Sequence, residues 1–271
     1  MDVSMYTLYA FNCGFKSPVD AFRHFYDRGV RYGDILDCEL KEYPLNDYCS
    51  YLRDAGIAPD AVVSIRNIAS FDKEKRTQCL SEVKELINQM EKQNIPFLML
   101  APSVELPQNM EEYQKLRELL IESFAHINQY ADGAVTVAIE NQSVPSRPDS
   151  RIEDIRYILD CLPDLGFVLD TGNFFCVEDD ALKACDVLSD RLLRIHAKDW
   201  QLDKFGSFVR ENIPRFEGVA LGKGMIPLKD MIAKLRNARH QGKAVIEINA
   251  RKVTLDMIDE SIDFLRNEIN V

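Results

Sequence analysis

The chain has 271 residues, a formal net charge of −11 and a charged fraction of 28%, which is ordinary for a globular protein. Its acidic balance argues against nucleic-acid binding, because the lysines and arginines are scattered and form no concentrated basic patch. No apolar stretch approaches the roughly 20 residues that a membrane-spanning helix needs, so a membrane role is not expected either.

The seven cysteines are odd in number and include no C-x-x-C pair, which argues against a disulfide framework or a zinc ribbon. The first residues, MDVSMYTLYAF, lack the basic region and the long apolar core of a signal peptide. We therefore predict reduced thiols and a cytoplasmic location.

Short apolar runs alternate with longer amphipathic stretches from one end of the chain to the other. The runs predict eight strands, near Tyr6–Phe11, Gly33–Leu40, Ala61–Ile68, Pro96–Ala101, Val135–Asn141, Phe167–Thr171, Leu192–Ala197 and Ala244–Asn249. The amphipathic stretches predict eight helices, near Pro18–Arg28, Leu45–Ala55, Asp72–Gln93, Asn109–Tyr130, Ser150–Cys161, Asp179–Ser189, Pro227–Arg239 and Leu255–Asn267.

This alternation requires parallel strands joined by helical crossovers, and a barrel of such units typically has about 250 residues. The sequence therefore predicts an α/β protein with the (β/α)8 TIM-barrel fold, in a single domain over residues 1–271. The longest irregular stretch, Gln201–Gly224, follows the seventh predicted strand. Loops of this length are usually functional, so we predict a lid or a pocket wall there.

Consecutive predicted strands, from the fifth to the eighth, end in polar residues that commonly bind metals. Glu140, Asp170, His196 and Glu247 close the apolar runs in VTVAIEN, FVLDTGN, LLRIHAKD and AVIEIN. Such side chains are costly to bury alone, and the C-terminal strand ends of a barrel converge on one face. Carboxylates with an imidazole suit Mn²⁺, Mg²⁺, Co²⁺ or Zn²⁺. These residues, called the quartet below, predict a site for one divalent metal ion.

The segments AIEN, LDTGN, IHAKD, LGKGMIP and IEIN, in this order, resemble the sugar phosphate isomerase/epimerase family of xylose isomerase-like barrels. The resemblance covers nearly the whole chain and is firmest between Val135 and Asn249. It implies that the quartet binds one divalent metal. It also implies that Glu140 and Glu247 act as acid and base on opposite faces of a small carbohydrate substrate, and dimers or tetramers are common among such barrels.

The same chemistry follows from the residue types. A metal that chelates a carbonyl and its neighbouring hydroxyl stabilises an enediolate, while one carboxylate removes a proton and another returns it. These parts allow epimerisation or aldose–ketose isomerisation of a sugar or sugar phosphate. They also allow dehydration, so an inosose-type dehydratase stays open as an alternative.

Two further functions are less favoured. An apurinic-site endonuclease would use many histidines for several zinc ions, whereas this chain has four histidines and an unfavourable charge. The chain could also be a non-catalytic binding protein in which the metal is structural, but this function would give the paired glutamates no role.

Several residues near the quartet are candidates for substrate binding. Lys198 and Asp199 follow His196 in the HxKD pattern that is common in the family, and Asp199 could instead orient His196. Asn173 stands where related epimerases often carry histidine, and its amide can hydrogen-bond a substrate hydroxyl. The further candidates are an apolar wall residue, a loop arginine and a strand-end carboxylate: Trp200, Arg215 and Glu39.

Overall fold

The computed structural model describes residues 1–102, 105–206, 208–210 and 213–270. Parallel strands form a closed barrel in the order β1-β11-β7-β6-β5-β4-β3-β2. Their bounds are β1 (Asp2–Tyr6), β2 (Tyr32–Leu36), β3 (Ala58–Arg66), β4 (Phe97–Pro102), β5 (Thr136–Glu140), β6 (Gly166–Asp170), β7 (Leu192–Ala197) and β11 (Lys243–Ile246). The predicted (β/α)8 TIM-barrel fold is confirmed.

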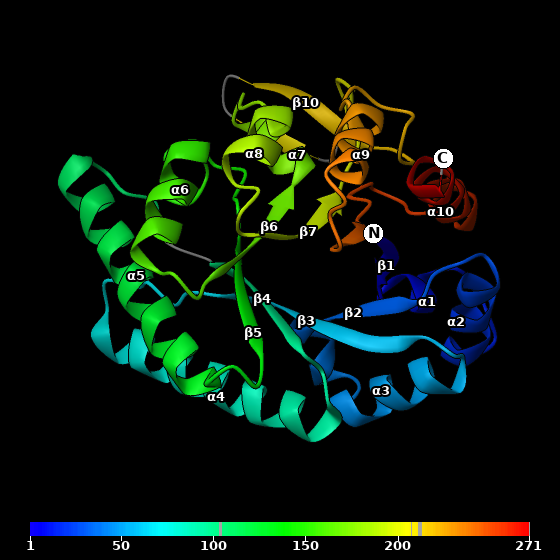
Figure 1. Ribbon diagram of the computed structural model, residues 1–271, viewed down its shortest axis with the longest axis horizontal. Coiled ribbons are helices and arrows are strands. Elements are labelled where there is room, and N and C mark those ends of the chain that lie inside the picture. Colours follow the sequence, from blue (N-terminus) through cyan, green and yellow to red (C-terminus); the bar gives the residue numbers. More distant parts are fainter. Residues whose placement is uncertain (103–104, 207, 211–212, 271) are drawn as a thin grey trace.

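Helices surround the barrel on its outer side, as Figure 1 shows. The main helices are α2 (Pro18–Asp27), α3 (Leu45–Asp54), α4 (Lys73–Gln93), α5 (Met110–Ala131), α6 (Ile152–Cys161), α8 (Ala181–Val187), α9 (Leu228–Asn237) and α10 (Leu255–Asn270). Short turns of helix lie at α1 (Tyr9–Asn12), α7 (Thr171–Cys176) and the 3-10 segment η1 (Asp37–Lys41). None of the helices within the described residues is both long and apolar enough to cross a membrane.

Helix α5 illustrates how the sequence sets an element. Its buried residues Leu116, Leu120, Phe124 and Ile127 recur at helical spacing, so one stripe faces the strands. The helix begins after Asn109, whose side-chain oxygen accepts a hydrogen bond from the Glu112 backbone N at 3.0 Å. The apolar period and the cap together fix where this helix lies and where it starts.

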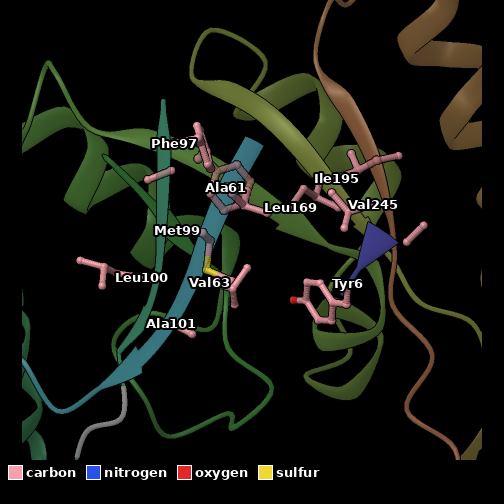
Figure 2. Packing of buried hydrophobic residues seen from close by; sticks show 14 of the residues in the cluster. Tyr6, Ala61, Val63, Phe97, Met99, Leu100, Ala101, Leu169, Ile195 and Val245 are labelled. Carbon is pink, nitrogen blue, oxygen red and sulfur yellow. The ribbon is translucent and has the colours of Figure 1, made fainter. Parts of the chain in front are cut away.

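The barrel interior is built from alternate residues along each strand. On β4, Phe97 and Met99 are both buried, and Figure 2 shows them among the packed side chains of the core. Deeper in the barrel, Arg194 of β7 pairs with Asp34 at 3.0 Å and also contacts Asp60. Its guanidinium lies 4.1 Å from the centre of the Phe97 ring. These buried ion pairs lie one layer below His196, which is the next residue of β7 to point into the barrel.

The first two predicted strands differ from the structure in their positions along the chain. The first strand ends at Tyr6, where it was expected to begin, and Tyr9–Asn12 is helical. Aromatic and aliphatic residues fill both segments, so the apolar pattern does not separate them. The second strand stops at Leu36, and the residues expected to continue it form η1.

The stretch Gln201–Gly224 is more ordered than predicted. It contains most of a small antiparallel sheet in the order β8-β10-β9, with β8 (Trp200–Leu202), β9 (Phe208–Arg210) and β10 (Ile213–Gly218). Because β8 begins three residues after β7 ends, this sheet stands at the C-terminal side of the barrel (Figure 1). The expectation of a wholly irregular loop is therefore corrected, although residues 207 and 211–212 lie outside the described part.

Candidate metal and substrate site

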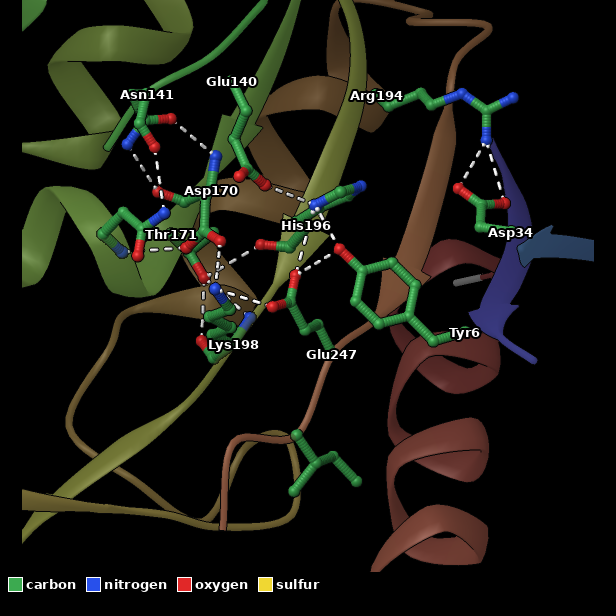
Figure 3. A network of polar contacts seen from close by, with 12 residues as sticks. Tyr6, Asp34, Glu140, Asn141, Asp170, Thr171, Arg194, His196, Lys198 and Glu247 are labelled. Atoms are coloured by element: carbon green, nitrogen blue, oxygen red, sulfur yellow. Dashed lines mark hydrogen bonds and ion pairs between the residues drawn. The ribbon is translucent and has the colours of Figure 1, made fainter. Parts of the chain in front are cut away.

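The quartet is gathered at the C-terminal ends of neighbouring strands. Glu140 and Asp170 are the last residues of β5 and β6, His196 lies near the end of β7, and Glu247 directly follows β11. These strands are consecutive in the barrel, and Asp170 is the register partner of His196. One ligand atom from each residue lies within 4.8 Å of the other three, and all four residues are buried (Figure 3).

His196 is held by the two glutamates of the quartet. Its Nδ1 lies 2.6 Å from Oε1 of Glu140 and 3.2 Å from Oε2 of Glu247. Burial alone would lower the pKa of His196, but the charge of Glu140 and the hydrogen bond to it outweigh burial and raise this pKa to about 10. At neutral pH the ring is therefore a cation set between carboxylates.

Lys198 places a second cation inside the quartet. Its Nζ lies 2.5 Å from Oδ2 of Asp170 and 2.7 Å from Oε1 of Glu247. Burial would raise the pKa of Glu247, yet Lys198 and His196 outweigh it and lower this pKa to about 2. Burial does prevail at Asp170, where it raises the pKa to about 7 although Lys198 opposes it.

Tyr6 completes this network and was missed from the sequence. Its hydroxyl donates to Oε2 of Glu247 at 2.8 Å and lies 3.1 Å from Nδ1 of His196. Its ring meets the imidazole edge-on at 5.4 Å. Tyr6 obeys the same rule as the quartet, since it is a polar residue at a strand end. The signal was hidden because the first strand was expected to begin at this residue.

The donor set fits a single divalent ion. Ligand atoms bound to one ion at about 2.1 Å can lie at most about 4.2 Å apart, so a spread of 4.8 Å needs only small side-chain adjustments. Carboxylate oxygens with one imidazole nitrogen are ligands that Mg²⁺, Mn²⁺ and Zn²⁺ accept. The buried negative charge of Glu140, Asp170 and Glu247 favours a cation at this point.

A pocket of about 750 Å³ opens above the quartet. Glu140, Glu247, Lys198 and Asn173 line it, together with Tyr6. Asn173 is fixed by two contacts, because its backbone N donates to Asp170 at 2.8 Å and its Nδ2 donates to the carbonyl of Asn141 at 2.9 Å. Lys198 and Asn173 therefore both face the space above the quartet.

A family model described as xylose isomerase-like TIM barrel matches residues 32–268. The chain belongs to the xylose isomerase-like TIM barrel family. This agrees with the resemblance drawn from the AIEN, LDTGN and IHAKD segments. No curated protein matches the chain.

Several solved structures share the fold. The IolI protein with a bound zinc atom is 16% identical with a TM-score of 0.77, over 99% of this chain and 96% of that one. A probable 3-DHS dehydratase, AsbF from Bacillus anthracis, is 14% identical with a TM-score of 0.76, over 98% and 99%. D-psicose 3-epimerase from Clostridium cellulolyticum H10 is 16% identical with a TM-score of 0.76, over 99% of each chain. At these identities the likeness establishes the fold alone.

In this member of the xylose isomerase-like family, two predicted carboxylates turn away from the pocket. Glu39 accepts hydrogen bonds from the hydroxyls of Tyr48 at 3.0 Å and Thr7 at 3.1 Å. Asp199 accepts from the backbone N atoms of Trp200, Gly222, Gly224 and Ile226 at 2.8–3.1 Å. Neither lines the pocket, and the hydrogen bonds of Asp199 go to the connection after β7 and not to His196.

Trp200 and Arg215 also lie outside the pocket lining. Trp200 is buried and packs near Phe216, with ring centroids 6.4 Å apart. Arg215 is an exposed residue of β10, and neither residue lines the pocket. Both belong to the β8-β10-β9 sheet and not to the barrel strands.

Proposed function

We propose that this protein is a divalent-metal-dependent isomerase or epimerase of a small sugar or sugar phosphate. The observation that carries the proposal is the convergence of Glu140 and Glu247, both buried and both within 3.2 Å of His196 Nδ1, at the base of one pocket. Two carboxylates at one reacting centre are what a proton transfer from carbon and back requires. An epimerase among the structures of the same fold is consistent with this reaction class.

Glu140, Asp170, His196 and Glu247 would hold the metal ion, which we propose to be Mn²⁺, Mg²⁺, Co²⁺ or Zn²⁺. When bound, it would supply positive charge that polarises a substrate carbonyl and stabilises the negative charge developing on its oxygen. The zinc in the IolI structure shows that one protein of this fold carries such an ion.

The chain's own residues would move the proton. Glu247 would accept the proton from the substrate carbon, and Tyr6 orients its carboxylate by donating to Oε2. Glu140 would return a proton to the opposite face or to the adjacent carbon. Asn173 would hold a substrate hydroxyl, and the Lys198 ammonium would face the enediolate oxygens.

Dehydration is the second candidate, and the position of Lys198 favours it. Its Nζ carries a proton 2.7 Å from Glu247 Oε1, so a base and an acid stand side by side. After Glu247 removes a proton from carbon, Lys198 could protonate a departing hydroxyl to give water. A probable 3-DHS dehydratase among the structures of the same fold is consistent with this reaction class.

Glu140→Gln and Glu247→Gln test the proposal. The protein is incubated with a panel of sugars and sugar phosphates in heavy water, and NMR measures the exchange of carbon-bound protons. We expect wild-type protein to exchange a carbon-bound proton of one substrate. Each variant should lose at least about 100-fold in exchange rate, the usual contribution of an acid–base residue.

Glu39→Gln is the matched control, because Glu39 is a partly buried glutamate outside the pocket, and this variant should keep the rate. Full turnover in both pocket variants would sink the proposal. A product that has lost water would assign the dehydratase reaction instead.

We also propose that the protein works in the cytoplasm. Cys13, Cys38, Cys49, Cys79, Cys161 and Cys185 are thiols outside any disulfide in the described residues, and a reducing compartment preserves that state. Cell fractionation tests this assignment, and recovery only from an oxidising compartment would contradict it.

A further inference from the structure

The pocket above the quartet has two chemically different halves. The polar lining residues come from the ends of β1 and β5 and from the segments that follow β1, β5, β6, β7 and β11. The opposite half comes from β2, β3 and β4, which are neighbours in the barrel. The lining residues that these three strands contribute are all aliphatic or thioether side chains, and they are called the apolar wall below: Leu36, Val63, Ile65, Met99 and Ala101. Figure 2 shows Val63 and Met99 facing the same interior space as Tyr6.

Polar groups occur close to these strands, but they are used outside the pocket. Asp37 accepts a hydrogen bond from the Ser64 hydroxyl at 2.6 Å and pairs with Arg66 at 3.1 Å. Glu39 is held by Tyr48 and is likewise outside the lining. The strand backbones pair with one another in register. Among the described lining residues of β2, β3 and β4, no side chain is therefore left to hydrogen-bond a ligand.

Ile65 carries most of the exposed surface of the apolar wall, while Val63, Met99 and Ala101 are buried. Ile65 is 61% exposed, although it is a large aliphatic residue in a pocket wall. The pocket volume of about 750 Å³ lies within the range that holds drug-sized molecules. There is space for a substrate body well beyond the atoms that react at the quartet.

On the basis of the proposed function, we infer that the substrate is an α-hydroxyketone whose body beyond the reacting carbons is apolar or largely deoxygenated. Its carbonyl and adjacent hydroxyl face Glu140 and Glu247, and its body lies on the apolar wall. When the body lies on this wall, hydroxyls on its remote carbons face side chains that cannot pair with them. Each such hydroxyl weakens binding by roughly tenfold.

A matched pair of ligands tests this inference by calorimetry with Mn²⁺-loaded protein. One is 1,3-dihydroxyhexan-2-one, and the other is 1,3,4-trihydroxyhexan-2-one, which adds a single remote hydroxyl. The wild-type protein should bind the first ligand about tenfold more tightly. Equal affinities, tighter binding of the second ligand, or no binding of either would overturn the inference.

Val63→Thr places a hydroxyl in the apolar wall with almost no change of volume. It should shrink the affinity ratio of the two ligands from about tenfold to nearly one. Met99→Gln should act in the same direction and serves if the first variant folds poorly. Val187→Thr is the matched control, because Val187 is exposed on α8 and outside the pocket, so its ratio should stay at the wild-type value. An unchanged ratio in both wall variants would contradict the inference.

Proton exchange into heavy water separates this inference from the proposed function. A clear preference for the dihydroxy ligand without any exchange at carbon would overturn the proposed function and keep the inference. Proton exchange with both ligands, bound at equal affinity, would support the proposed function and overturn the inference.

Discussion

Lys198 sets the charge balance of the quartet. It lies on the same side of the chain as His196, two residues earlier, and its ammonium bridges Asp170 and Glu247 within 2.7 Å. A divalent ion bound by those two carboxylates would occupy nearly the same space. Lys198 would therefore compete with such an ion for the quartet, and metal entry would require the ammonium to leave its place between the two carboxylates.

Lys198→Met should separate metal affinity from stability. Without the competing ammonium, the affinity for Mn²⁺ should rise by about tenfold or more, measured by chelator competition. Without added metal, the free energy of unfolding should fall by about 3–5 kcal/mol, because two buried carboxylates lose their cation. Lys252→Met removes a charge from the exposed pocket rim and should change neither quantity much. Unchanged or weaker metal binding in Lys198→Met would contradict the competition.

Metal binding should also depend on pH through His196. Its pKa is raised to about 10, because the charge of Glu140 outweighs burial, so the ring is protonated at neutral pH. A ligating imidazole must be neutral, and binding therefore releases this proton. The apparent association constant should rise by about tenfold per pH unit between about pH 7 and 9. Calorimetry in buffers of different protonation enthalpy measures the released proton. An affinity that is constant over this range would refute the assignment of His196 as a ligand.

At the scale of elements, Asp199 joins the barrel to the small sheet. Its carboxylate accepts backbone hydrogen bonds from Trp200 at the start of β8 and from Gly222, Gly224 and Ile226 beyond β10. These bonds close the excursion that contains β8, β9 and β10 and return the chain toward α9. The role of Asp199 is thus to fix a long connection beside the pocket.

Asp199→Ala should therefore destabilise the fold. The free energy of unfolding should fall by about 3 kcal/mol, because several buried backbone N–H groups lose their acceptor. Denaturant unfolding measures this loss. Asp186→Ala is a suitable control, because its carboxylate is exposed and pairs with Lys234 at the surface, where such pairs contribute little. Equal stability of the two variants would show that the connection does not depend on Asp199.

For the whole molecule, the strand and helix alternation was enough to predict the barrel and the place of the quartet. Asp170 and His196 could be found because each closes an apolar run, and parallel strands deliver their ends to one face. Asp199 was misplaced because successive residues point to opposite sides, so Asp199 turns away where His196 and Lys198 turn in. The roles of Lys198 and Tyr6 within the quartet depend on side-chain packing across strands, which a linear pattern does not contain.

The quartet joins four strands that are far apart in sequence, so a bound ion should stabilise the whole barrel. At a free metal concentration about 100 times the Kd, the free energy of unfolding should rise by about 2.7 kcal/mol. Thermal unfolding with and without Mn²⁺ measures the shift. Asp170→Asn should lose most of it, whereas a similar shift in this variant would indicate binding elsewhere.

The most direct test of the metal centre is a crystal structure of Mn²⁺-loaded protein with anomalous scattering recorded for manganese. We predict one strong anomalous peak within about 2.3 Å of donor atoms from Glu140, Asp170, His196 and Glu247. In the same map, Lys198 Nζ should have left its place between Asp170 and Glu247. A map without a peak at the quartet, or with the only peak elsewhere in the molecule, would contradict the account.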